Sequence, residues 1–186
     1  MIFTETPLAG AYLIEPEALT DERGIFARIW CARELAAHGL ETGVAQCSLS
    51  YNPVAGTLRG LHYQVEPHGE VKIVRCTAGS VFDAIVDLRA DSPTCGQYYA
   101  VVLSAANRRL LYVPRGFAHG FQTLENGSEV SYQMSQFYEP GSGRGVRWND
   151  PAFAIPWPAT DHRVMSERDR TYPDFYRSSL QEQSGG

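Results

Sequence analysis

Short apolar segments, each followed within a few residues by a turn-forming set, run through most of this chain. Segments such as 57–64 (TLRGLHYQ), 71–79 (VKIVRCTAG) and 97–104 (QYYAVVLS) are rich in residues that favour strands. Between the segments lie sets such as 91–93 (DSP) and 125–127 (ENG), whose residues favour turns. This spacing is typical of a β-sandwich or barrel. No long helical pattern alternates with the strands, as a doubly wound α/β fold would require. The chain is therefore predicted to be all-β.

Two short helical segments are expected within this β structure. Residues 32–39 (ARELAAHG) contain good helix formers, and Gly39 can end the helix. Residues 166–170 (SERDR) predict a short helical turn. In the strand predicted at 80–89, apolar side chains alternate with Asp83 and Asp87, which places the two aspartates on one face.

The length of 186 residues fits one domain with a sizeable core. Its composition, 44% hydrophobic and 20% charged, is that of an ordinary soluble globular protein. No internal repeat or linker divides it. We therefore predict a single domain over residues 1–176, followed by a polar, flexible C-terminal tail at 177–186.

The charge pattern and the chain's apolar runs exclude several classes of function. The net charge of −5 gives no reason to expect nucleic acid or an anionic membrane as a partner. No apolar run is long enough to cross a bilayer, and the first ten residues do not resemble a secretory signal. The four cysteines are widely spaced and form no C-x-x-C pair. We therefore expect a cytoplasmic protein with reduced thiols.

Three residues on separate predicted strands have the chemistry of proton transfer. His62 can act as a base near neutral pH, because the ordinary pKa of histidine lies there. Lys72 can stabilise negative charge that develops on an oxygen, and Tyr132 can return a proton. Alternate side chains of a small barrel point into its interior, so the three could converge. Taken singly, each residue type is more often a packing or surface residue.

A metal site is the alternative reading of the same histidines. The segment 114–121 (PRGFAHGF) contains His119 in a P-x-G-x-x-H pattern that resembles the second motif of the cupin superfamily. Cupins that bind metal usually also carry an H-x-H pair, but here the sequence reads His62-Tyr63-Gln64. A transition-metal site normally needs three or more protein ligands. We therefore expect no metal, and a metal-dependent cupin oxygenase or isomerase remains an alternative.

Several longer segments together carry a more specific signal. These are DERGIF, GTLRGLHYQ, VKIVRCTAGSVFDAIVDLRADSPTCG, LYVPRGFAHGF, EVSYQMSQFY, VRWNDPAFAIPWP and SERDR, in this order from about residue 8 to about residue 170. In these segments the chain resembles the dTDP-4-dehydrorhamnose 3,5-epimerase family of carbohydrate epimerases. The resemblance implies a cupin-like double-stranded β-helix, a jelly-roll barrel. It also implies an isomerase without a cofactor that forms a homodimer by exchange of N-terminal strands.

The resemblance assigns a role to each candidate catalytic residue. It implies that His62 is the general base and that Asp169 orients the His62 ring. Tyr132 is implied as the acid on the opposite face of the sugar, and Lys72 as the stabiliser of an enolate oxygen. The implied reaction inverts carbon 3, carbon 5 or both in a nucleotide-linked 4-keto-6-deoxyhexose. Such a reaction needs no redox cofactor, because the oxidation state does not change.

The resemblance also implies a set of substrate contacts: Arg23, Phe26, Arg28, Gln46, Arg59, His119, Tyr138 and Arg170. Arg59 and Arg23 are expected to bind the diphosphate, with Arg23 reaching in from a partner subunit. Tyr138 is expected to stack on the base, and His119 to bind or polarise the substrate.

Two positions depart from the family pattern and leave the nucleobase open. Arg28 stands where the family often has a glutamate, and Ser48 stands where an asparagine is common. A glutamate suits the ring N–H donor of thymine, whereas an arginine suits the acceptor of cytosine. We expect a dTDP sugar, as in the conversion of dTDP-4-dehydro-6-deoxyglucose to dTDP-4-dehydrorhamnose, with a CDP sugar as the alternative. A non-catalytic sugar-nucleotide binding protein is a third possibility, which intact His62, Tyr132 and Asp169 argue against.

Overall fold

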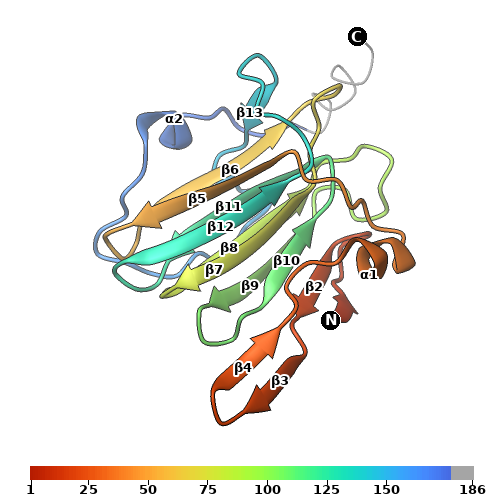
Figure 1. Ribbon diagram of the computed structural model, residues 1–186. Helices are drawn as coiled ribbons and strands as arrows, with labels where there is room; N and C mark the ends of the chain where they lie inside the picture. Colours follow the sequence, from red (N-terminus) through yellow and green to blue (C-terminus); the bar gives the residue numbers. More distant parts are fainter. Residues whose placement is uncertain (177–186) are drawn as a thin grey trace.

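The computed structural model describes residues 1–176, which form antiparallel β-sheets with two short helices (Figure 1). One six-stranded sheet contains, in spatial order, β1 (Ile2–Glu5), β2 (Tyr12–Glu15), β10 (Leu110–Val113), β7 (Lys72–Ala78), β12 (Ser128–Met134) and β5 (Gln46–Asn52). A five-stranded sheet contains β13 (Gly143–Gly145), β6 (Leu58–Gln64), β11 (Phe117–Thr123), β8 (Ser80–Asp87) and β9 (Tyr98–Ser104). The prediction of an all-β, jelly-roll architecture is confirmed.

The main hydrophobic core lies between these two sheets. Val74 and Val130 of the six-stranded sheet contribute to the same buried cluster as Ile85 and Phe121 of the five-stranded sheet. Burial of this apolar surface is the dominant favourable term in folding. The two sheets are thereby held face to face, and any polar side chain on an inner face points into the space between them.

The outer faces of the sheets are covered as well. The segment after β13 packs Phe153 and Ile155 against the outer side of β8. On the other sheet, α1 (Ala32–Ala37) buries Leu35 against Ile73 and its neighbours. Strand β8 is therefore covered on both faces, so the aspartates that alternate with its apolar residues are fully buried instead of facing water.

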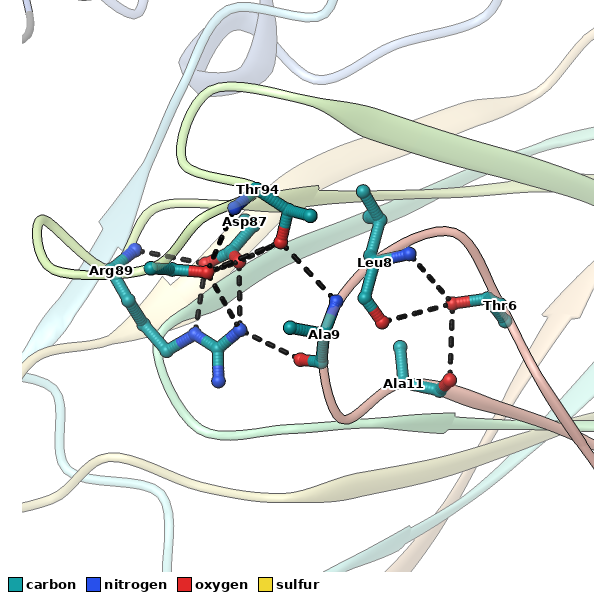
Figure 2. Close-up of polar contacts among 8 residues, drawn as sticks. Thr6, Leu8, Ala9, Ala11, Asp87, Arg89 and Thr94 are labelled. Atoms are coloured by element: carbon teal, nitrogen blue, oxygen red, sulfur yellow. Dashed lines mark hydrogen bonds and ion pairs between the residues drawn. The ribbon is translucent and has the colours of Figure 1, made fainter.

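One of these aspartates ties the loop after β8 to the N-terminal segment (Figure 2). The Asp87 carboxylate accepts hydrogen bonds from Arg89 Nη2 at 2.7 Å, from Thr94 Oγ1 at 2.6 Å and from the Ser92 hydroxyl. Arg89 also donates to the Ala9 carbonyl at 2.7 Å. Burial acts to raise the pKa of Asp87, but the surrounding donors outweigh it and lower the pKa. The carboxylate is thus charged and fully paired.

Both predicted helices are confirmed. Helix α1 is followed by Gly39 at a positive φ of 69°, which suits glycine at the end of a helix. Helix α2 (Glu167–Arg170) begins after Ser166, whose side chain accepts from the Asp169 backbone N–H at 3.1 Å. Within residues 1–176, no helix is both long and apolar enough to cross a membrane. The tail predicted at 177–186 lies outside the described residues, and the single-domain boundary stays a prediction.

A two-stranded hairpin of β3 (Ala18–Asp21) and β4 (Gly24–Ala27) projects away from the two main sheets (Figure 1). Its side chains are largely exposed, including Leu19 and Phe26. This projection separates the hairpin from the space between the sheets of its own chain.

Candidate active site

A cavity of about 910 Å³ opens between the two sheets, at a volume typical of ligand sites. It is lined by side chains of both sheets and by residues from the α2 region. Most of the residues predicted from the sequence line it: Gln46, Arg59, His62, Lys72, His119, Tyr132, Tyr138 and Asp169. The structure therefore brings together residues that lie far apart in the sequence.

The two histidines converge because their strands pair directly. His62 of β6 lies opposite His119 of β11 in the antiparallel register, and residues opposite each other share one face of a sheet. The strands approach closely beside this pair. A Cβ atom on Gly60 would lie 2.7 Å from the Cα atom of Gly120, and Gly60 has a positive φ of 119°. Glycine at this position allows the approach and the backbone conformation.

His62 is bound to a buried carboxylate. Its Nε2 lies 2.7 Å from Oδ1 of Asp169, and Oδ2 of Asp169 accepts from the Gly60 N–H at 3.1 Å. Burial acts to raise the pKa of Asp169, but the hydrogen bond and charge of His62 and the other donors outweigh it and lower the pKa. The carboxylate therefore holds a proton of His62 on Nε2 and leaves Nδ1 as the nitrogen that can accept a proton. The His62 side chain is 42% exposed, so it is open to the cavity.

The facing sheet contributes Tyr132 and Lys72. The Tyr132 ring meets His119 edge to face, with ring centroids 5.9 Å apart. Burial raises the pKa of Tyr132 well above its usual value, and the Asp83 charge raises it further, with Arg59 acting in the opposite direction. The hydroxyl therefore stays protonated and can act as a proton donor.

Lys72, which lines the cavity, is held by two oxygen partners. Its Nζ donates to the His62 carbonyl at 3.1 Å and lies 3.1 Å from Oε1 of Glu70. Glu70, which was not among the residues predicted from the sequence, also lines the cavity. The available signal was its position two residues before Lys72, which puts both on one face of an extended segment.

His119 is paired with a second carboxylate, that of Asp83, which was not predicted from the sequence as a site residue. Its Nε2 lies 2.9 Å from both oxygens of Asp83, and both side chains are almost completely buried. Burial raises the pKa of Asp83, while the charges of His119 and Lys72 act to lower it. The available signal was the position of Asp83 between apolar residues of β8, because a buried aspartate needs a polar partner.

Polar and aromatic residues surround the mouth of the cavity. Arg59 donates from Nε to the Asn52 side-chain oxygen at 2.8 Å. The Tyr138 backbone N–H donates to Oε1 of Gln46 at 2.6 Å, while the Tyr138 ring is exposed. Ser48 also lines the cavity.

The arginine of α2 that lines the cavity differs from the predicted one. Arg168 is among the lining residues, whereas Arg170 is exposed and is not among them. The two residues are two apart in a helix, so their side chains point in different directions. Arg144 of β13 lines the cavity as well.

Three predicted residues in the hairpin or directly after it are not brought to the cavity of their own chain. Arg23 is paired with Asp21 within the hairpin, and the Arg28 guanidinium lies 2.7 Å from Glu34 of α1. The Phe26 side chain is 75% exposed. None of the three lines the cavity.

The described residues contain no group of three or more His, Cys, Asp or Glu side chains that could hold a metal ion. His62 and His119 are instead bound to two different carboxylates, Asp169 and Asp83. The pairing in each case places a carboxylate on Nε2 of the ring.

Known proteins resemble this chain in both sequence and fold. The family model for dTDP-4-dehydrorhamnose 3,5-epimerase matches residues 5–177. A protein of that name from Methanothermobacter thermautotrophicus is 43% identical over 91% of this chain and 92% of its own length. The crystal structure of the Bacillus anthracis epimerase with TDP and PPi bound has a TM-score of 0.89 and 41% identity, covering 94% of this chain and 99% of that chain. The Legionella pneumophila epimerase in complex with dTDP-4-keto-L-rhamnose has a TM-score of 0.85 and 36% identity, covering 90% of this chain and 89% of that chain. This chain therefore belongs to the dTDP-4-dehydrorhamnose 3,5-epimerase family and is an isomerase of the epimerase class.

Proposed function

We propose that this enzyme inverts carbons 3 and 5 of a dTDP-linked 4-keto-6-deoxyhexose by proton transfer between His62 and Tyr132. One observation carries the proposal. His62 of one sheet, held by Asp169 of α2, and Tyr132 of the facing sheet line a single cavity, which Lys72 also lines. A base and an acid that approach from different sides are what inversion of a carbon centre requires.

The chemistry follows from these groups. The ketone at carbon 4 acidifies the C–H bonds at carbons 3 and 5. Nδ1 of His62 takes one proton, and the electron pair of the broken C–H bond moves onto the carbonyl oxygen to form an enolate. The Lys72 ammonium stabilises this oxygen, and the negative charge of Asp169 stabilises the imidazolium. The Tyr132 hydroxyl then delivers a proton to the opposite face, which re-forms the ketone with the centre inverted. His62 then releases its extra proton to solvent, and the Tyr132 oxygen takes a proton from solvent, which returns both residues to their starting states.

The charged mouth of the cavity suits a nucleoside diphosphate. Arg59 and Arg168 provide guanidinium groups for the diphosphate, since planar N–H donors match phosphate oxygens. The exposed ring of Tyr138 offers a stacking surface for the base. Binding of TDP and PPi by the Bacillus anthracis relative supports this assignment.

Incubation with dTDP-4-keto-6-deoxyglucose in deuterated water tests the function. We expect deuterium at both carbon 3 and carbon 5, together with the inverted product. Deuterium at only one carbon would restrict the enzyme to that centre. Lack of any exchange despite tight binding would indicate a binding protein instead. Activity lost to a chelator, with stoichiometric metal in the purified protein, would point to the metal-dependent alternative.

The Arg28–Glu34 ion pair leads to a prediction about the nucleobase. Because Arg28 has a carboxylate partner in its own chain, we propose that it does not read the base and that the substrate carries thymine. Calorimetry should show that the wild-type enzyme binds dTDP more tightly than CDP. Arg28→Glu should change both affinities by the same factor. The opposite result has two parts: the wild-type enzyme binds CDP more tightly than dTDP, and Arg28→Glu strengthens dTDP binding but not CDP binding. That result would show that Arg28 contacts the base and would favour the CDP-sugar alternative.

The projecting hairpin leads to a prediction about assembly. Leu19, Ile25 and Phe26 are exposed on it, and a cluster of exposed apolar side chains marks a contact surface. We propose that the hairpin packs on a second copy of the chain and brings Arg23 to the partner's cavity. Light scattering should show a homodimer at micromolar concentration, which Phe26→Asp weakens. Val102→Asp, at an exposed apolar site on β9, is the control. A fully active wild-type monomer would contradict the proposal.

A further inference from the structure

We propose that Tyr172 is a positioning residue for His62, and this inference rests on the proposed function of His62 as the base. Tyr172 follows α2 and is not among the residues that line the cavity. Its ring nevertheless meets the His62 ring, with centroids 6.2 Å apart and an angle of 70° between the planes. Edge-to-face contact of this kind is a favoured arrangement for aromatic rings.

The place occupied by the Tyr172 ring exists because β13 has a glycine there. Gly145 lies directly opposite His62 in the pairing of β13 with β6. A Cβ atom on Gly145 would overlap the Tyr172 ring and would lie 2.7 Å from its hydroxyl oxygen. Gly145 does not have a positive φ, so the close approach of the ring, and not the backbone conformation, is what requires glycine.

The contact depends on the ring more than on the hydroxyl. Within residues 1–176, the Tyr172 hydroxyl is buried and makes no hydrogen bond of normal geometry. Arg168 lies beside the same ring, with its guanidinium carbon 5.7 Å from the ring centroid. Tyr172 therefore packs between a residue that lines the cavity and the histidine proposed as base.

The hydrogen bond to Asp169 does not by itself fix the orientation of the His62 ring. Asp169 binds one ring nitrogen, and a single hydrogen bond leaves the imidazole free to tilt about it. The cavity side of the ring is open, as the 42% exposure of the side chain indicates. The Tyr172 ring, in edge-to-face contact with the imidazole, limits this tilt. A misplaced base reduces the rate of proton abstraction without weakening substrate binding.

The first test separates kcat from KM. Tyr172→Ala should lower kcat and the rate of deuterium exchange about tenfold, which is the scale of one lost aromatic contact, and leave KM unchanged. Tyr172→Phe keeps the ring and should retain nearly wild-type kcat. An Ala variant with wild-type kcat, or one in which KM rises while kcat is unchanged, would overturn the inference. So would a Phe variant as slow as the Ala variant.

The second test uses the glycine. Gly145→Ala should lower kcat because the added methyl group displaces the Tyr172 ring, while Gly43→Ala, where the added methyl group meets no atom within 4 Å, should have no effect. The double variant Gly145→Ala/Tyr172→Ala should be no slower than Tyr172→Ala alone, because the ring is then absent. Losses that multiply in the double variant would show that Gly145 acts on His62 without Tyr172 and would overturn the inference.

A third measurement distinguishes failure of this inference from failure of the proposed function. The NMR signals of the His62 ring, titrated with pH in the free enzyme, should change between wild type and Tyr172→Ala but not in Gly43→Ala. Unchanged signals would overturn the positioning role even if catalysis is as proposed. Wild-type exchange in a His62→Asn variant would instead overturn the proposed function, whatever Tyr172 does.

Discussion

His62→Asn should abolish deuterium exchange at both carbon 3 and carbon 5 while nucleotide binding stays close to that of the wild type. The loss should be about 10²–10⁴-fold, as is usual for one acid–base group. Asparagine cannot accept a proton at neutral pH. The Asp169 carboxylate keeps the Gly60 N–H as a donor in this variant, and an unchanged unfolding temperature would show that the loss of rate reports on the base and not on the fold. Exchange is followed by NMR, and binding of dTDP by calorimetry.

His162→Asn is the matched control for this variant. His162 is exposed and does not line the cavity, so the same change of side chain should leave exchange unaffected. If His62→Asn exchanges deuterium as fast as the wild type, another group is the base. If both exchange and dTDP binding are lost, with an unfolding temperature equal to that of the wild type, His62 binds substrate and is not only a base.

Tyr132→Phe should separate exchange from inversion. The substitution retains the ring and its contact with His119 but removes the proton donor. His62 can still take a proton and return it to the face from which it came. We therefore expect deuterium to enter the substrate while net inversion falls about 100-fold. Both can be read from one reaction in deuterated water, by NMR of the sugar protons.

Tyr98→Phe, on the exposed edge strand β9, is the control for this substitution. Equal loss of exchange and inversion in Tyr132→Phe would show that Tyr132 does more than protonate the enolate. Because the pKa of Tyr132 is raised, its hydroxyl should remain a donor above the ordinary tyrosine pKa of about 10. If inversion by the wild-type enzyme were instead lost as the pH rises through neutrality, while deuterium exchange continued, the proton donor would have a much lower pKa. That result would contradict the assignment of Tyr132.

The fold class and much of the cavity could be predicted from the sequence. Alternating apolar segments and turn sets are local features, and they predicted the strands around His62, Lys72 and Tyr132. The helix formers before Gly39 and the segment 166–170, which predicted α2, are local as well. Such signals depend on neighbours a few residues away, so they can be read without knowing the tertiary structure.

Contacts within the cavity depend on strand register and on the packing of the two sheets. The pairing of His119 with Asp83 exists because both faces of β8 are covered, which alternation within the strand does not reveal. Likewise, the direction of α2 decides that Arg168, and not Arg170, lines the cavity.

The hairpin and Tyr172 show the same limit of the sequence. Arg28 has Glu34 as its partner because of how β4 and α1 are arranged, and family resemblance alone implied a base contact. Tyr172 reaches His62 because Gly145 leaves room for its ring on a strand far from it in the sequence. Local patterns thus determined the strands and the helices, and the family resemblance supplied the candidate residues of the site. Only the tertiary structure decided which side chains meet, because contacts between distant residues are set by register and close packing of the whole chain.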